Sequence, residues 1–141
     1  MDILTDKNPA NDQGVTPLHL AAEMGHIESV EIIFEWADDK CPMDFDEGWT
    51  PFHLASKEGH LSIVQFFLKN LELPKDNENN TPLHLAIEYF QNEVFQEIYY
   101  AINDINSVNR NGESLIEFAE RVDNFEVVEF LKKRKRIKAQ N

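Results

Sequence analysis

Cysteine and glycine are both scarce in this sequence of 141 residues. Cys41 is the single cysteine, so no disulfide can form within the chain, which fits a reducing compartment. None of the five glycines belongs to a glycine-rich loop of the kind that cradles a phosphate group. The scarcity of these two residues argues against a disulfide scaffold and against a nucleotide-binding loop.

Long apolar runs are also missing. No stretch of 18 apolar residues occurs, so the sequence predicts no membrane span. Residues 1–11 lack the basic start and the apolar stretch of a signal peptide. With 42% hydrophobic residues in one domain's length of chain, these features predict a soluble intracellular module, in the cytoplasm or the nucleus.

Basic residues are few outside the last ten positions. Residues 1–131 hold all 26 acidic residues and seven basic ones, a formal charge of −19, whereas residues 132–141 hold six basic residues and no acid. An acidic body repels nucleic-acid phosphates, which disfavours nucleic acid as its partner. It favours partners with basic segments and steers their association. The alternative is that the acidity only keeps an exposed surface soluble.

A short string recurs along the chain. Thr-Pro-Leu-His stands at Thr16–His19 and Thr81–His84, and Thr-Pro-Phe-His stands at Thr50–His53. A fainter copy occupies Ser114–Glu117, and the four copies start 34, 31 and 33 residues apart. A near-constant period of about 33 residues indicates a stack of structural repeats.

Each residue of the string suits the start of a helix. The Thr hydroxyl caps free backbone N–H groups, and Pro fits the first helical position, where its missing donor costs nothing. The Leu or Phe points into the core, and the His can bond back to the Thr or to an adjacent turn. Gly25 supplies the left-handed residue that ends the first helix. A second helix follows, with apolar residues every three or four positions from Ile27 to Phe34.

These strings, spacings and turn residues closely resemble the ankyrin-repeat family, over roughly residues 3–135. The resemblance implies an all-α fold, an ankyrin-repeat solenoid of four helix-turn-helix repeats with short hairpin-like loops. The expected helices span residues 17–24, 27–36, 51–58, 61–70, 82–89, 93–101, 115–121 and 125–135. A single domain, 1–131, would contain the tail of a partial or missing repeat (1–12), repeat 1 (13–45), repeat 2 (46–76), repeat 3 (77–109) and repeat 4 or C-terminal cap (110–131), followed by a basic tail (132–141).

The third and fourth copies depart from the pattern. Phe90 and Gln91 replace the Gly-His pair of the first two repeats, and Asn92 is the candidate for the left-handed position because Asn tolerates that geometry better than Phe. Asn79 replaces a turn glycine for the same reason. Repeat 4 keeps Gly112 but lacks the Pro and His, as expected at the end of a stack.

The first twelve residues resemble the end of a missing repeat, with Ile3 and Leu4 closing a second helix. No polar capping repeat precedes them in the sequence. Either the chain is excised from a longer array or repeat 1 tolerates an unusually thin cap. We favour excision.

Catalytic and metal sites are not indicated. His19, His53 and His84 occupy one position in successive repeats, about 10 Å apart as packed helices are, so they cannot share a zinc ion with bonds of about 2 Å. Cys41 has no flanking catalytic signature. The acidic clusters lack the ligand spacing and pivotal glycine of an EF-hand calcium loop. We therefore expect no enzyme activity, no metal and no cofactor.

Function is then expected on the displayed surface. The ankyrin resemblance implies that partners bind the concave face, which is formed by loop tips and by the exposed side of each first helix. The positions at the loop tips are Asp12, Gln13, Val15, Asp46, Glu47, Trp49, Asn77, Glu78, Asn80, Arg110, Asn111 and Glu113. The positions on the first helices are Glu23, Met24, Lys57, Glu58, Glu88, Tyr89, Arg121 and Val122.

This set mixes acids with Trp49, Met24 and Tyr89. Aromatic side chains ringed by polar groups are typical of binding hot spots. Trp49 precedes the capping Thr50 and should face outward; the alternative is that its ring folds over its own hairpin. The expected partner is a protein or peptide with basic segments, bound by a monomer.

The basic tail has three interpretations. Its cations are Lys132, Lys133, Arg134, Lys135, Arg136 and Lys138. Such a run can be a nuclear-import signal, a nucleic-acid patch or a contact for anionic lipid. The alternative is a solvated terminus whose cations favour the negative end of the last helix, although one or two lysines would suffice for that. In an excised chain the run can instead be a linker to a further domain.

Two functions therefore compete. The first is a non-enzymatic protein–protein interaction module whose acidic, aromatic-centred groove accepts a basic segment. The second is a structural spacer from a longer array, with the basic tail as a nuclear-import or electrostatic docking element. Binding that weakens with salt and is lost in Trp49→Ala would support the first, and further repeats encoded upstream would support the second. The fold serves proteins of unrelated roles, so the sequence does not name the partner.

Overall fold

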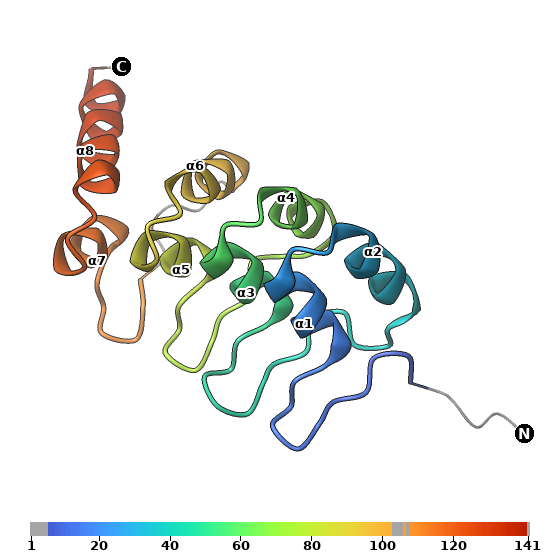
Figure 1. Ribbon diagram of the computed structural model, residues 1–141. Helices are drawn as coiled ribbons and strands as arrows, with labels where there is room; N and C mark the ends of the chain where they lie inside the picture. Colours follow the sequence, from blue (N-terminus) through green and yellow to red (C-terminus); the bar gives the residue numbers. More distant parts are fainter. Residues whose placement is uncertain (1–5, 103–105, 107, 141) are drawn as a thin grey trace, which may run out of the picture.

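A computed structural model describes residues 6–102, 106 and 108–140. These residues form eight α-helices and no strand (Figure 1). The helices are α1 (Pro17–Met24), α2 (Ile27–Trp36), α3 (Pro51–Glu58), α4 (Leu61–Asn70), α5 (Pro82–Glu88), α6 (Asn92–Ala101), α7 (Leu115–Arg121) and α8 (Phe125–Ala139). The predicted all-α solenoid of four helix pairs is confirmed.

The helices form two layers. The first helix of each pair packs on the first helix of the next, from α1 through α3 and α5 to α7, while α2, α4 and α6 follow one another in the outer layer. Figure 1 shows the loops hanging side by side from one end of the inner helices. The surface formed by these loop tips and inner helices is the concave face named above. Its residues are therefore carried by stacked rigid elements.

The recurring string starts each inner helix as predicted. The Thr16 hydroxyl accepts a hydrogen bond from the His19 backbone N–H at 3.3 Å, and the His19 Nδ1 accepts from the Thr16 N–H at 3.1 Å. The same reciprocal cap forms between Thr50 and His53 and between Thr81 and His84. Ser114 and Glu117 build it in the fourth repeat. Each cap satisfies donors that a helix start would otherwise leave free.

The turn that ends the inner helix of repeat 3 differs from the prediction. Phe90 takes the left-handed conformation, with φ of 59°, whereas Asn92 is already the first residue of α6. The reason is register: the left-handed residue stands nine positions after the cap in every repeat, as Gly25 does after Thr16. Stacking fixes that position even in repeat 3, where the left-handed backbone of Phe90 costs about 1–2 kcal/mol. Asn79 is left-handed, with φ of 63°, as predicted.

The core runs through the stack between the two layers. Phe67 of α4 lies at its centre, with ring centroids 5.4 Å from Phe52 and 6.1 Å from Phe34. Near the other end, Phe130 of α8 packs edge-on against Phe95, at 5.5 Å, and Tyr99, at 5.2 Å, both from α6. These rings join α8 to the outer layer.

Helix α8 is longer than predicted, running to Ala139 rather than to residue 135. The basic tail, expected as a separate segment, therefore continues the last helix. Lys and Arg are good helix formers, and Arg136 and Lys138 lie in the final turn, where cations meet the negative end of the helix dipole. Helices α5 and α6 each differ from the prediction by one residue, and the helix end expected at Ile3 and Leu4 lies outside the described residues.

Repeats 3 and 4 are expected to open before repeats 1 and 2. Repeat 3 carries the strained turn at Phe90. It also contains His84, whose Nε2 atom is buried without a hydrogen-bond partner among the described residues. In a linear stack such losses are felt mainly by adjacent repeats. Hydrogen exchange read by mass spectrometry should show α6, α7 and α8 exchanging before α1 to α4. Faster exchange in the first two repeats would contradict this order.

Candidate protein-binding face

The loop tips of the concave face form one continuous row. The backbone N–H of Phe45 donates to the Gln13 carbonyl at 2.9 Å, and that of Asn77 donates to the Glu47 carbonyl at 3.0 Å. The N–H of Arg110 donates to the Glu78 carbonyl at 2.9 Å. Each tip is thus tied to the next by a backbone bond, so the predicted tip residues are held at fixed spacing.

A side-chain oxygen inside each loop holds its tip in shape. Asp76 Oδ1 accepts from the backbone N–H groups of Glu78 and Asn80, at 2.9 and 2.8 Å. Asn11, Asp44 and Asn109 play the same part in the other loops. Our sequence analysis missed these residues. Their signal is an Asn or Asp five or six positions before each capping Thr or Ser.

Trp49 reaches from its own loop to the loop of the following repeat. Its indole Nε1 donates to Asp76 Oδ2 at 3.0 Å, and the residue is half-buried. A rigid ring fixed by one polar bond loses little conformational entropy when a partner covers it. Trp49 is therefore preorganised between repeats 2 and 3.

Lys57 of α3 lies between two aromatic rings at the middle of the face. Its Nζ is 5.4 Å from the centre of the Trp49 ring and 5.2 Å from the centre of the Tyr89 ring. The same Nζ lies 3.4 Å from a carboxylate oxygen of Glu58. Cation–π attraction to two rings orders side chains from repeats 2 and 3 into one cluster. We call Trp49, Lys57 and Tyr89 the central cluster.

The acids of the face divide into paired and unpaired groups. Glu78 pairs with Arg110 at 3.2 Å, and Glu113 pairs with Arg121 at 2.7 Å. The hydrogen bond from Arg121, followed by that from Asn109, holds the pKa of Glu113 below its ordinary value. Among the described residues, no ion pair is made by Asp12, Glu23, Asp46, Glu47 and Glu88. These five carboxylates give the face its uncompensated negative charge.

Phe45 adds an exposed aromatic ring that the sequence analysis did not select. Its side chain is 71% exposed and lines a hollow of about 500 Å³ between the first two loop tips. Asp12, Asp44 and Asp46 share that hollow. An exposed ring beside acids suits a partner that carries both apolar and basic groups.

The predicted site residues are therefore distributed rather than gathered into one pocket. Most are exposed along all four repeats, while seven are half-buried, namely Val15, Glu23, Trp49, Lys57, Asn80, Glu113 and Val122. The structure brings together three smaller groups of them: the central cluster, the arginine–glutamate pairs, and the residues of the hollow between the first two loop tips. The cations of the basic tail lie on α8, at the C-terminal end of the stack and away from the loop tips (Figure 1).

The repeated architecture agrees with comparison to known families. A model of three ankyrin repeats matches residues 35–108, and a model of a single ankyrin repeat matches residues 13–39. The chain belongs to the ankyrin-repeat family. No curated protein is similar enough to the chain to count as a match. Ankyrin repeats are generally modules of protein–protein interaction, and the proteins that contain them are typically not enzymes.

The histidines of the ankyrin repeats are engaged in structural bonds. His19 Nε2 bonds the Trp49 carbonyl at 2.9 Å, and His53 Nε2 bonds the Asn80 carbonyl at 2.8 Å, tying each repeat to the next. Burial lowers the pKa of both, and lowers the pKa of His84 to about 4. In the part of the chain that the structure describes, no three His, Cys, Asp or Glu side chains are grouped to hold a metal ion. Nor is any helix of that part both long enough and apolar enough to span a membrane.

Proposed function

We propose that this ankyrin-repeat chain binds a protein or peptide with basic segments on its concave face. The observation that carries the proposal is the central cluster of Trp49, Lys57 and Tyr89, flanked by carboxylates without ion pairs. Preorganised rings can supply most of the binding energy once water is excluded around them. The surrounding carboxylates supply attraction and orientation for lysine and arginine side chains.

The acidic and the aromatic residues of the concave face are expected to affect different steps of binding. Charged groups at the rim mainly steer encounter, because their fields extend beyond contact distance. Buried aromatic contacts mainly set how long the complex lasts. A partner approaching the loop tips meets Asp46 and Glu47 beside Trp49. It meets Met24, 63% exposed, on the neighbouring inner helix.

Removal of unpaired acids from the concave face is expected to slow association. Changing Glu23, Glu47 and Glu88 to Gln should lower the on-rate for a basic partner about fivefold to tenfold at low salt, and should flatten its salt dependence. These three are preferred to Glu58 and Glu78, which already have cationic partners. The partner would first be captured from lysate, and the rates would then be measured by surface plasmon resonance.

A matched control removes three charges from the outer layer. Glu28, Glu31 and Glu35 are exposed acids of α2, and their change to Gln alters the net charge by the same amount. The control should leave the on-rate within about twofold, because it lies away from the docking face. Equal slowing by both triple variants would show that net charge, and not the concave face, attracts the partner.

A spacer role within a longer array is the second candidate. Ile32 and Trp36 of α2 are 61% and 60% exposed on a side that no described helix covers. A further repeat would bury such a surface. In this case the exposed cations of α8 would act in nuclear import or in electrostatic docking inside the cell, and the chain would act as a monomeric unit. Their removal would alter localisation and leave binding by the concave face intact.

A further inference from the structure

A cleft of about 320 Å³ lies beside the C-terminal half of α8, on a different part of the molecule from the concave face. Its floor includes Tyr99 of α6, Leu115 of α7 and Leu131 of α8. Its rim is formed by Arg134, Lys135 and Lys138. The volume falls within the range of roughly 300–1,000 Å³ that is usual for small-ligand sites.

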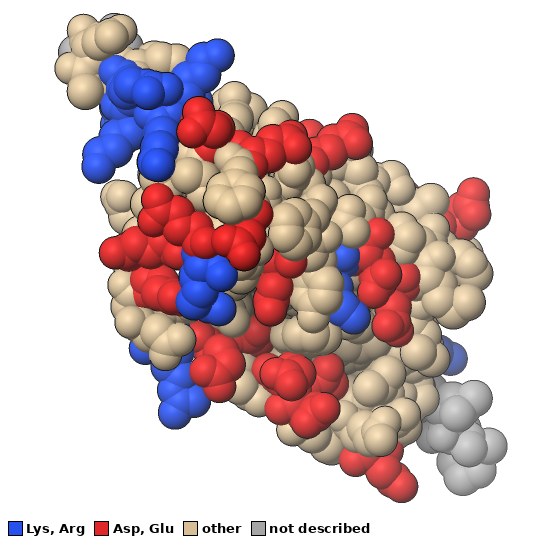
Figure 2. All heavy atoms as spheres, turned by 60° about the vertical axis from the view of Figure 1, so that its left-hand side comes forward, with Lys and Arg blue, Asp and Glu red and all other residues tan. Residues whose placement is uncertain are grey.

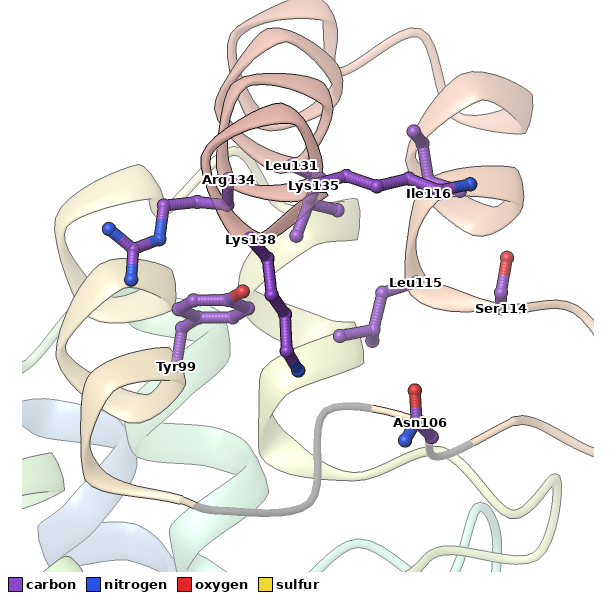
Figure 3. A pocket seen from close by; sticks show the side chains of 9 residues that line it. All are labelled: Tyr99, Asn106, Ser114, Leu115, Ile116, Leu131, Arg134, Lys135 and Lys138. Carbon is purple, nitrogen blue, oxygen red and sulfur yellow. The ribbon is translucent and has the colours of Figure 1, made fainter. Parts of the chain in front are cut away.

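The three rim cations come from one helix, and Lys138 lies nearest the floor of the cleft. Figure 3 shows the Lys138 side chain running between Tyr99 and Leu115, with Arg134 on the Tyr99 side and Lys135 on the Ile116 side. Positions 134 and 138 are four apart on a helix, and 135 and 138 are three apart, so their side chains share one face. The Phe130 packing holds α8 against α6, so that Lys138 runs along the apolar floor while Arg134 and Lys135 flank it on either side.

The positive charge of the rim is not neutralised by the rest of the described chain. The described part shows one ion pair from the basic tail, between Lys132 Nζ and Glu120 at 3.7 Å, and Lys132 does not line the cleft. Arg134 lies over the Tyr100 ring, 5.5 Å from its centre. Figure 2 shows Lys and Arg side chains gathered at one end of the molecule, while acidic side chains are spread over the rest of that face. Like charges on one helix face repel each other, and an anion in the cleft would relieve that repulsion.

The floor restricts which anion fits. Tyr99 and Leu115 are buried core residues that turn one side toward the cleft. A small inorganic ion would leave this apolar surface in contact with water, whereas an attached hydrocarbon chain would cover it. We propose that the cleft binds an anionic amphiphile, namely a phosphate or carboxylate group joined to an apolar chain. The charged group would lie at Lys138, with Arg134 and Lys135 adding attraction from either side, and the chain would lie against Tyr99, Leu115 and Leu131.

Calorimetric titration with hexyl phosphate and with inorganic phosphate tests this proposal. Hexyl phosphate should bind about tenfold more tightly or better, because its chain is buried on the floor. Methyl resonances of Leu115 and Leu131 should shift on its addition. Equal affinity for the two phosphates, or unmoved methyl resonances, would overturn the proposal in favour of plain attraction to a basic helix.

Two double variants of equal charge locate the site. Lys135→Gln with Lys138→Gln removes two rim cations and should weaken the binding of hexyl phosphate about tenfold. Lys133→Gln with Arg136→Gln removes two exposed cations of the same helix that do not line the cleft, and should change affinity by less than about twofold. All four positions are exposed, so circular dichroism should show both variants folded. Equal weakening by the two double variants would overturn the assigned site.

The source of the amphiphile is decided by a further arm of the titration. Vesicles of phosphatidylcholine containing phosphatidic acid present the same chemistry at a membrane surface. One outcome is that the protein binds both hexyl phosphate and the vesicles, and that only the variant of Lys135 and Lys138 loses vesicle binding. This outcome identifies a lipid headgroup region as the source. Hexyl phosphate binding without vesicle binding identifies a soluble ligand. Vesicle binding that both double variants reduce equally, without hexyl phosphate binding, would overturn the proposal.

Discussion

Replacement of Trp49 by alanine is expected to weaken partner binding about thirtyfold, or about 2 kcal/mol, chiefly by raising the off-rate. The indole spans two repeats through its bond to Asp76 and packs beside Lys57. Its removal deletes buried area and frees the cation that it holds. The on-rate should stay within about threefold, because the charges that steer encounter are unchanged. Surface plasmon resonance with the captured partner separates the two rates.

Trp36→Ala is the matched control for this change. Trp36 is the other tryptophan of the chain and lies on α2, 60% exposed and outside the concave face. Its loss should leave both rates nearly unchanged. Both variants should retain the helical circular-dichroism spectrum, because neither residue belongs to the buried core. A Trp36 effect equal to that of Trp49 would place the interface on the outer layer.

The free energy of unfolding is expected to fall as the pH is lowered from 7 to 5, with His84 contributing about 2 kcal/mol of the loss at pH 5. Burial lowers the pKa of His84 to about 4 from an ordinary value of 6.5. The stability that depends on neutral His84 is therefore fully present above about pH 6.5 and is lost as the pH falls toward 4. The unfolded chain takes up a proton in this interval, and the folded chain does not. Urea denaturation at several pH values measures the loss.

His84→Gln separates this residue from the other titrating groups. Gln can complete the cap with Thr81, much as Glu117 completes it with Ser114, so the helix start is preserved. The variant should show a flatter dependence of unfolding free energy on pH than the wild type. A slope unchanged in His84→Gln would show that the imidazole titrates equally in the folded and unfolded states.

Local chemistry made the fold predictable from the sequence. The capping threonines, the following prolines and the turn glycines each have a strong conformational preference, so their regular recurrence located seven of the helix starts to the residue. The family comparison and the helices agree with that prediction. Repeat 4 remained recognisable because Ser114 and Glu117 form the same cap from different residues.

Other features depended on contacts that no local preference encodes. Phe90 is left-handed because stacking fixes the register. Residue preference alone had favoured Asn92 for the left-handed position. The bond from Trp49 to Asp76 joins residues 27 positions apart. Lys57 was selected only as a position on a first helix, whereas its two aromatic neighbours make it the centre of the face.

Site-specific photo-crosslinking to the captured partner tests the central proposal, that partners bind the concave face, most directly. A photoreactive phenylalanine analogue would replace Tyr89 on the concave face, Trp36 on the outer layer or Lys133 on the basic helix, one at a time. All three positions are exposed, so the probe can reach a bound protein. We predict crosslinks from position 89 and none from positions 36 and 133. Crosslinks from position 133 without any from position 89, together with unchanged binding by Trp49→Ala, would contradict the proposal and place the interface on the basic helix.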